Sequence, residues 1–156
     1  MENGADSVME NYNVDLGRME MVGAALPLQE HWLAQSNVDL LLPPVNVSVL
    51  FCYKRKSSDV KSFSVVVANV KASLSQALVS LYPFAGRLVT NMHGELELLC
   101  NNEGAGFSQA YADADLEFVD FSGPDVSVEG KLVSARVSHH LAKDDRGLLP
   151  LLCIQV

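Results

Sequence analysis

The sequence predicts an α/β domain, because one amphipathic helix stands among several strand-like segments. Apolar residues at three- and four-residue spacing predict the helix over residues 65–80. Residues 46–53 are the clearest strand, with apolar side chains at every second position. Residues 87–101 predict a hairpin, since a polar turn at 91–94 separates two strand-like runs. At 156 residues the chain is long enough for one domain.

The segments before the helix are less regular. We expect residues 1–11 to form a mobile acidic tail. Residues 12–25 are strand-like but imperfect, and residues 28–42 favour a loop or short helical turns. The strand over 46–53 has apolar residues at its alternate positions too, so we expect both of its faces to be partly buried.

The helix is expected to end at a proline turn. Its predicted apolar stripe comprises Val66, Val70, Leu74, Ala77, Leu78 and Leu81. Pro83 lacks an N–H and disfavours helix in the residue before it, so Tyr82 closes the helix. Gly86 then permits a tight turn into a strand over residues 87–90.

Further strands are expected after the hairpin turn. Residues 95–101 predict a half-solvated strand and residues 107–112 another one. The Gly104-Ala105-Gly106 segment lacks the third glycine of a phosphate-binding loop, so we interpret it as a tight turn. Residues 113–130 are acidic and rich in turn formers, and residues 148–156 form an apolar run.

Composition excludes several classes of partner. The apolar fraction of 49% argues against disorder, and the net charge of −8 disfavours nucleic acids and anionic membranes. No apolar run approaches the roughly 20 residues that span a bilayer. The polar, acidic start lacks the pattern of a signal peptide, so a cytoplasmic location is expected.

Cys52, Cys100 and Cys153 have no metal-ligand spacing and are interpreted as small buried hydrophobic residues.

Short segments spread over residues 26–156 resemble one enzyme family. The most informative is Tyr82-Pro83-Phe84-Ala85-Gly86-Arg87-Leu88. The others, in chain order, are residues 26–28, 36–40, 49–53, 74–78, 97–102 with 106–107, 129–133 and 150–156. The chain resembles the N-terminal part of a plant BAHD acyltransferase, and within that family the branch of coniferyl alcohol acyltransferases and anthranilate N-benzoyltransferase-like enzymes.

The resemblance implies a fold and a reaction. Residues 12–156 would form an incomplete half of a chloramphenicol-acetyltransferase-like sandwich, a mixed sheet with a packed helix, without the second domain. Family members transfer an acyl group from acyl-CoA, which is a co-substrate rather than a bound cofactor, to an alcohol or amine. We expect this chain to be a truncated piece of such an enzyme, here called the parent enzyme, that ends before the catalytic motif and is inactive by itself. The parent enzyme would be monomeric and would bind no metal. The alternative is a non-catalytic interaction protein that pairs through an exposed sheet edge.

The family's catalytic motif, His-x-x-x-Asp, is expected after the strand that residues 153–156 begin. Its histidine acts as the general base. His140 and Asp144 have the same spacing, but they precede that strand and lie in polar, loop-like sequence. We therefore interpret them as a decoy and assign no catalytic residue. His31 is interpreted as structural and His93 as a turn residue.

The resemblance also indicates acceptor-pocket candidates. Val47, Val49 and Phe51 lie on the strand that sends alternate side chains toward the acceptor. Apolar side chains at these positions disfavour a polyhydroxylated acceptor and favour an aromatic alcohol or amine. The alternative, that these three residues fill the core, is left open.

Overall fold

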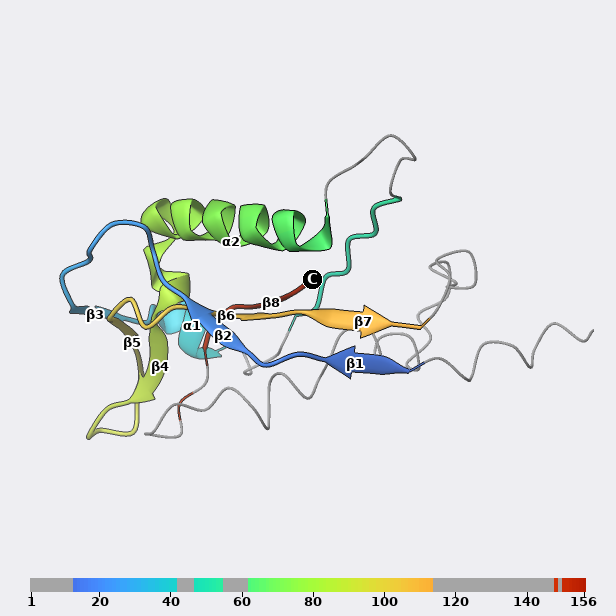
Figure 1. Ribbon diagram of the computed structural model, residues 1–156. Coiled ribbons are helices and arrows are strands. Elements are labelled where there is room, and N and C mark those ends of the chain that lie inside the picture. The colour runs from blue at the N-terminus through green and yellow to red at the C-terminus, as the bar shows by residue number, and fades with distance from the viewer. Residues whose placement is uncertain (1–12, 42–46, 55–61, 114–147, 149) are drawn as a thin grey trace, which may run out of the picture.

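The structure is a computed structural model that describes residues 13–41, 47–54, 62–113, 148 and 150–156 (Figure 1). Its elements are β1 (Val14–Leu16), β2 (Glu20–Val22), β3 (His31–Ala34), α1 (Asn37–Leu41), α2 (Phe63–Ser80), the 3₁₀ helix η1 (Tyr82–Ala85), β4 (Arg87–Thr90), β5 (Leu96–Cys100), β6 (Ala105–Ser108), β7 (Ala110–Ala112) and β8 (Cys153–Gln155). A long helix packed on a mixed sheet confirms the predicted α/β class. The predicted acidic tail and residues 114–130 lie outside the described residues.

The described strands form three sheets. The sheet with the order β2-β6-β8 is mixed, because β6 pairs antiparallel with β2 and parallel with β8. β1 and β7 form a separate two-stranded sheet that continues the pairing of β2 with β6. Where these two sheets meet, the Gly17 N–H donates to the Gln109 carbonyl at 2.7 Å. Segments 14–22 and 105–112 therefore run side by side as one antiparallel ribbon (Figure 1). The third sheet has the order β3-β5-β4.

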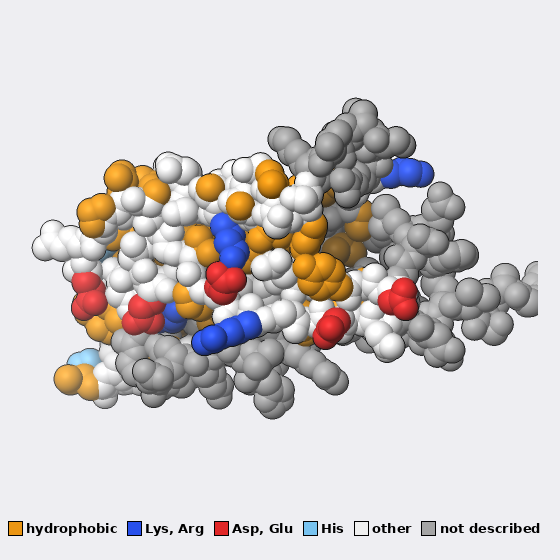
Figure 2. Space-filling view, viewed as in Figure 1, with side chains coloured by type: hydrophobic (Ala, Val, Ile, Leu, Met, Phe, Trp, Pro, Cys, Tyr) orange, Lys and Arg blue, Asp and Glu red, His pale blue; other side chains and the backbone are white. Residues whose placement is uncertain are grey.

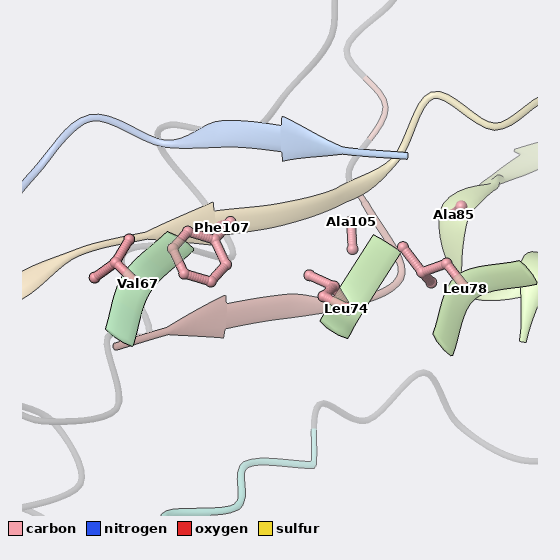
Figure 3. Close-up of a cluster of buried hydrophobic side chains, with 6 residues drawn as sticks. All are labelled: Val67, Leu74, Leu78, Ala85, Ala105 and Phe107. Carbon is pink, nitrogen blue, oxygen red and sulfur yellow. The ribbon is translucent and has the colours of Figure 1, made fainter. Parts of the chain in front are cut away.

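The helix α2 covers one face of the β2-β6-β8 sheet and buries the core (Figure 3). Val67, Leu74 and Leu78 are its buried residues, and they pack with Phe107 and Ala105 of β6. The predicted stripe was correct at Leu74 and Leu78 and in part at Val70, which packs against the core. It was wrong at Ala77, which is exposed, and at Val66, which is 40% exposed while Val67 is buried. Leu81 is 53% exposed because the helix ends at Ser80, before that position.

Helix α2 is 18 residues long and has a mean hydropathy of 1.3, so by length and composition it could cross a membrane. The expectation that no apolar run approaches this size was therefore too strict. In this structure the helix packs on the sheet, and core helices meet the same criterion. Figure 2 shows apolar side chains exposed over α2. Val65 of this helix is 43% exposed.

A polar contact joins α2 to the sheet beside this core. The Lys71 ammonium lies 2.7 Å from a Glu20 carboxylate oxygen and 5.1 Å from the centre of the Phe107 ring. The aliphatic stem of a lysine can cover apolar surface while its charged end reaches solvent. Lys71 therefore links α2 to both β2 and β6.

The segment between α2 and β4 turns as predicted, but Gly86 is required for another reason. Pro83 sits in the first turn of η1, which follows α2 directly. Gly86 has extended backbone angles rather than a positive φ. A Cβ atom there would lie 2.4 Å from the Leu99 carbonyl oxygen, so only glycine lets β4 and β5 approach this closely.

The predicted hairpin is present as β4 and β5, paired antiparallel with Leu88 opposite Leu98. The Asn91 side-chain oxygen accepts hydrogen bonds from the N–H groups of His93 and Glu95, at 2.9 and 3.0 Å. Gly94 has a φ of +82°. An asparagine that bonds backbone groups within its own turn and a glycine at positive φ are a typical turn combination.

Three element predictions were wrong. The Gly104-Ala105-Gly106 segment is a turn only at Gly104, because Ala105 and Gly106 are the first two residues of β6 and pair with β2. Residues 47–53 are not a strand: they have no regular structure and are exposed, and no described strand pairs with them. A strand needs such a partner for its backbone N–H and C=O groups. Conversely, residues 31–34 form β3 where a loop or helical turn was expected, because they pair with β5, far away in sequence. The helical-turn prediction was correct at α1.

The cysteine prediction holds at one position of three. Cys100 lies on β5 and is fully buried. Cys52 is exposed because its segment forms no strand in this structure. Cys153 lies on a strand, as expected, but this strand is at the edge of its sheet and the side chain is exposed.

Candidate functional site

The three acceptor-pocket candidates do not lie in the core. The exposed fractions of Val47, Val49 and Phe51 are 82%, 66% and 71%. The described structure therefore does not support the alternative that they fill the core. Their orientation toward an acceptor is not tested, and that role stays a prediction.

The histidines give no assembled catalytic group in the described residues. His140 and Asp144 lie outside these residues, so their interpretation as a decoy stays a prediction. The His31 Nδ1 atom donates to the Gln29 carbonyl at 2.9 Å, since a carbonyl oxygen can only accept. The ring of His31 contacts that of Tyr82, with centroids 5.3 Å apart. His93 is exposed in the hairpin turn. The contacts of His31 are those of a structural residue, and His93 lies in a turn, as the sequence predicted.

The described structure does contain one buried charged group that the sequence reasoning missed. The Arg87 side chain is 3% exposed, and its Nη1 atom donates to the carbonyl oxygens of Gly86 and Gly104, both at 2.8 Å. Its Nε atom lies 3.2 Å from the Glu103 carboxylate, close enough for an ion pair but without the alignment of a hydrogen bond. We call Arg87, Glu103 and these two carbonyl groups the Arg87 anchor.

The carboxylate in this anchor is itself held in place. The Asn101 side-chain amide donates to the Glu103 carboxylate at 2.7 Å, and the Glu103 N–H donates back to the Asn101 side-chain oxygen at 3.2 Å. The Gly104 N–H donates to the Ala85 carbonyl at 2.9 Å. Arg87 also forms an isolated backbone bridge with Pro150, just before β8. The anchor therefore joins η1, the turn between β5 and β6, and the approach to β8.

A second polar junction lies next to the Arg87 anchor. Asn102 has a φ of 55°, and its side-chain oxygen accepts from the Ala24 N–H at 2.7 Å. On the other side of the same loop, the Ser75 hydroxyl donates to the Gly23 carbonyl at 2.9 Å and the Ala25 N–H donates to the Ser75 carbonyl at 2.9 Å. Residues 23–25 are thus fixed between α2 and the turn after β5.

These groups have the chemistry of a scaffold rather than of a reaction centre. An arginine keeps its proton throughout the range in which enzymes work, so Arg87 cannot serve as a general base. Burial raises the pKa of Cys100. Burial also raises the pKa of Cys153, although Arg87 and a hydrogen bond with the Gly106 backbone oppose the rise. Both thiols are therefore protonated at neutral pH, and a protonated thiol is a poor nucleophile.

The signal for the Arg87 anchor was present in the sequence. Arg87 is the single charged residue in an otherwise apolar and aromatic block, residues 81–89. A charge in such a block needs a partner if it is buried. The sequence could not show that the partner is Glu103, because the contact depends on how the hairpin and the following turn fold back.

Comparison with known proteins places the chain in one family. The model of the Transferase family, which comprises the BAHD acyltransferases, matches residues 12–156. The chain belongs to this family.

Several relatives of this BAHD chain have names that state their reactions. This chain is 32% identical to a hydroxycinnamoyltransferase of Narcissus pseudonarcissus, and the match covers 92% of this chain and 31% of that protein. It is 35% identical to a taxadien-5-alpha-ol O-acetyltransferase of Taxus chinensis over 92% of this chain and 32% of that protein. It is 34% identical to a putrescine hydroxycinnamoyltransferase of rice over 78% of this chain and 27% of that protein. The chain thus spans about a third of the length of the curated relatives it matches.

The structure gives a physical role to several of the family-like segments. The Tyr82-to-Leu88 block supplies η1, the close contact at Gly86 and the Arg87 anchor. Residues 97–102 supply β5 and the Asn102 junction, and residues 74–78 supply Leu74, Ser75 and Leu78 of α2. In this BAHD chain these segments therefore hold the scaffold together.

Proposed function

We propose that this chain is part of an enzyme that transfers an acyl group from acyl-CoA to the hydroxyl or amine of an aromatic metabolite. The observation that carries the proposal is the family match over residues 12–156. Relatives named as hydroxycinnamoyl- and acetyltransferases support acyl transfer as the reaction. The enzyme would act in the cytoplasm and would use acyl-CoA as a co-substrate, with no resident cofactor.

The proposed acceptor class follows from the side chains at residues 47–51. Val47, Val49 and Phe51 can exclude water from an aromatic ring, but they offer no hydrogen bond to a hydroxyl group. A polyhydroxylated acceptor would lose hydrogen bonds to water on entering such a pocket, which disfavours its binding. An aromatic alcohol or amine presents one reacting polar group and an apolar body.

We further propose that the 156 residues are inactive by themselves. They span about a third of the relatives' length, and no histidine among the described residues contacts a carboxylate that could orient it as a base. Acyl transfer needs a base within hydrogen-bond reach of the acceptor proton.

The test compares the chain alone with a chimera in which it replaces the matching third of the Narcissus hydroxycinnamoyltransferase. Release of coenzyme A from a hydroxycinnamoyl-CoA is measured with an aromatic alcohol and with shikimate as acceptors. We expect no activity from the chain alone, with or without His140→Ala, and activity from the chimera with the aromatic alcohol. Activity of the chain alone that disappears in His140→Ala would overturn the proposed inactivity.

The acceptor claim is tested in the same chimera. Val49→Ser with Phe51→Tyr should shift the ratio of kcat/KM values toward the hydroxylated acceptor by about tenfold or more, because a site that hydrogen-bonds a hydroxyl discriminates strongly. Ser48→Ala is the matched control, since it alters a neighbouring position outside the proposed pocket set. Equal ratios in all three proteins would contradict the acceptor assignment.

A second candidate is a non-catalytic interaction protein that pairs through an exposed sheet edge. The observation that favours it is the position of β8, which has a described neighbour on one side only. Sedimentation of the purified chain over a range of concentrations tests it. A monomer at every concentration counts against this candidate, whereas self-association that Ile154→Asp abolishes supports it.

A further inference from the structure

The first observation is that Arg87 meets the starts of both β6 and β8. Its Nη1 atom donates to the Gly104 carbonyl oxygen at 2.8 Å, and the next residue begins β6. Its backbone bridges to Pro150, shortly before β8 begins. One residue of β4 is therefore tied to the entry points of two strands that are direct neighbours in another sheet.

The second observation is that β8 is held by a short parallel pairing. It spans 3 residues, and parallel pairs are slightly less stable per residue than antiparallel ones. The pairing includes the Gly106 N–H, which donates to the Leu152 carbonyl at 2.9 Å, and the Val156 N–H, which donates to the Ser108 carbonyl at 3.0 Å. The direction of so short a strand depends on how firmly its start is fixed.

The third observation is that the charge of Arg87 acts on Cys153, the first residue of β8. Burial raises the pKa of Cys153, and the Arg87 charge opposes this rise. A Cβ atom on Gly106 would lie 3.0 Å from the Cys153 Sγ atom, so β6 and β8 touch closely at the same point. Both the backbone and the charge of Arg87 thus act where β8 joins the sheet.

We propose that Arg87 is a positioning residue for acyl transfer, because its contacts at the starts of β6 and β8 set the direction in which β8 leaves the sheet. This inference rests on the proposed function, in which the catalytic histidine of the parent enzyme follows β8. A strand that starts in a shifted position carries the shift to the residues after it. A displacement of about 1 Å at a reacting group can lower the rate about a hundredfold. Arg87 acts through the histidine and does not touch the substrate.

Amide hydrogen exchange of the full 156-residue chain, resolved by residue with NMR, tests the effect on β8. Arg87→Met removes the guanidinium group, so the Gly106 and Val156 amides, which bond between β6 and β8, should exchange about tenfold faster or more. Arg87→Lys keeps the charge but loses the planar guanidinium, so its effect should be smaller.

Asn91→Ala is the matched control for this experiment. It removes the Asn91 side-chain bonds to the His93 and Glu95 N–H groups, beyond the opposite end of β4 from Arg87. Exchange should become faster in the β4–β5 hairpin and stay unchanged at Gly106. Equal acceleration at Gly106 in Asn91→Ala and Arg87→Met would overturn the inference, since a loss of global stability acts on both regions alike.

The same variants in the chimera with the Narcissus hydroxycinnamoyltransferase test the effect on catalysis. At a temperature where circular dichroism shows each variant folded, Arg87→Met should lower kcat about tenfold or more and change KM for the acyl-CoA less than about twofold. The reason is that the base is displaced while the substrate-binding surface is kept. Arg87→Lys should recover part of the loss, and Asn91→Ala should keep the kcat of the unaltered chimera.

The two ways in which this experiment can fail are distinguishable. An active chimera whose folded Arg87→Met variant keeps its kcat would overturn the positioning role alone. An unaltered chimera without activity would overturn the proposed function and, with it, this inference.

Discussion

At the scale of single residues, the described structure depends on a few polar side chains that bridge distant segments. Arg87 joins the end of η1 to the turn after β5, and Asn102 joins that turn to residues 23–25. Arg87 supplies hydrogen bonds to the buried carbonyl groups of Gly86 and Gly104, and Asn102 supplies one to the partly buried Ala24 N–H. When such a partner is removed, the remaining polar groups stay out of water without a hydrogen bond, and the protein loses stability by their full desolvation free energy.

Arg87→Ala should therefore be one of the more damaging substitutions. We expect it to lower the free energy of unfolding by about 3 kcal/mol, because two carbonyl groups and the Glu103 carboxylate lose their cation. Urea denaturation measures the loss. Lys71→Ala is the control, since its ion pair with Glu20 is more exposed and should contribute less than about 1 kcal/mol. Equal losses in the two variants would contradict the role of the Arg87 anchor.

Ser36 and Asp39 form a reciprocal cap at the start of α1. The Ser36 hydroxyl and N–H donate to one Asp39 carboxylate oxygen at 2.6 and 3.1 Å, and the Asp39 N–H donates to the Ser36 oxygen at 3.2 Å. The hydrogen bond from the Ser36 side chain, followed by that from its backbone, lowers the pKa of Asp39 below 3.8. A lowered carboxyl pKa adds stability that is fully present well above 3.8 and is lost as pH falls through the folded-state value.

Ser36→Ala should raise the pKa of Asp39 toward 3.8, because the largest cause of its depression is removed. An NMR titration of the Asp39 carboxyl carbon measures this change. Ser62→Ala is a matched control: Ser62 precedes α2 in the same way but makes no side-chain cap hydrogen bond. An unchanged Asp39 pKa in Ser36→Ala would show that the cap does not form in solution.

At the scale of elements, two turns around β5 use glycine for different reasons. Gly94, in the β4–β5 turn, has a φ of +82° and open space around its missing Cβ. Gly104, in the β5–β6 turn, has a φ of +99°, and a Cβ there would lie 2.8 Å from both the carbonyl carbon and the oxygen of Val22. At Gly94 a larger residue is disfavoured only by the left-handed backbone conformation. At Gly104 it is disfavoured both by that conformation and by the close contact with Val22.

Gly104→Ala should consequently destabilise the protein more than Gly94→Ala. We expect Gly94→Ala to cost about 1–2 kcal/mol from the left-handed backbone alone. Gly104→Ala should cost about 1–3 kcal/mol more, because β2 must move away from the turn. Chemical denaturation of both variants provides the comparison, and a similar loss in each would refute the close contact with Val22.

The elements also show where sequence reasoning succeeds. The hairpin and α2 were predicted because their signals are local: a turn with asparagine and glycine, and apolar side chains at helical spacing. Strand β3 and segment 47–53, with which no described strand pairs, were predicted wrongly because pairing with a distant strand is not encoded in a segment's own residues.

At the scale of the whole molecule, the family and the α/β class could be predicted, whereas the Arg87 anchor could not. The class follows from the periodicity of a few segments. The anchor requires residues 86, 87, 103 and 104 to meet, which only the folded arrangement determines. The acceptor-pocket candidates remain a prediction for a related reason, because a pocket is a property of several segments together.

The three cysteines provide a probe of global opening. Cys100 is fully buried on β5, whereas Cys52 and Cys153 are exposed. A maleimide should label Cys52 quickly, Cys153 more slowly because its pKa is raised, and Cys100 roughly a thousandfold or more slowly than Cys52, because Cys100 reacts only from opened molecules. Mass spectrometry after proteolysis gives the three rates. In denaturant the rates should converge, and fast labelling of Cys100 in native buffer would show that β5 is not part of a stable core.

The position of β8 in the sequence also governs the order of assembly during synthesis. β6 and β8 are direct neighbours in the sheet, yet residues 109–152 separate them along the chain. A ribosome completes α2 and β6 well before it reaches β8, so Phe107 and the adjoining core remain incompletely covered for that interval. Apolar surface exposed in this way is what chaperones bind, and the nascent chain is expected to depend on them until residue 155 has emerged.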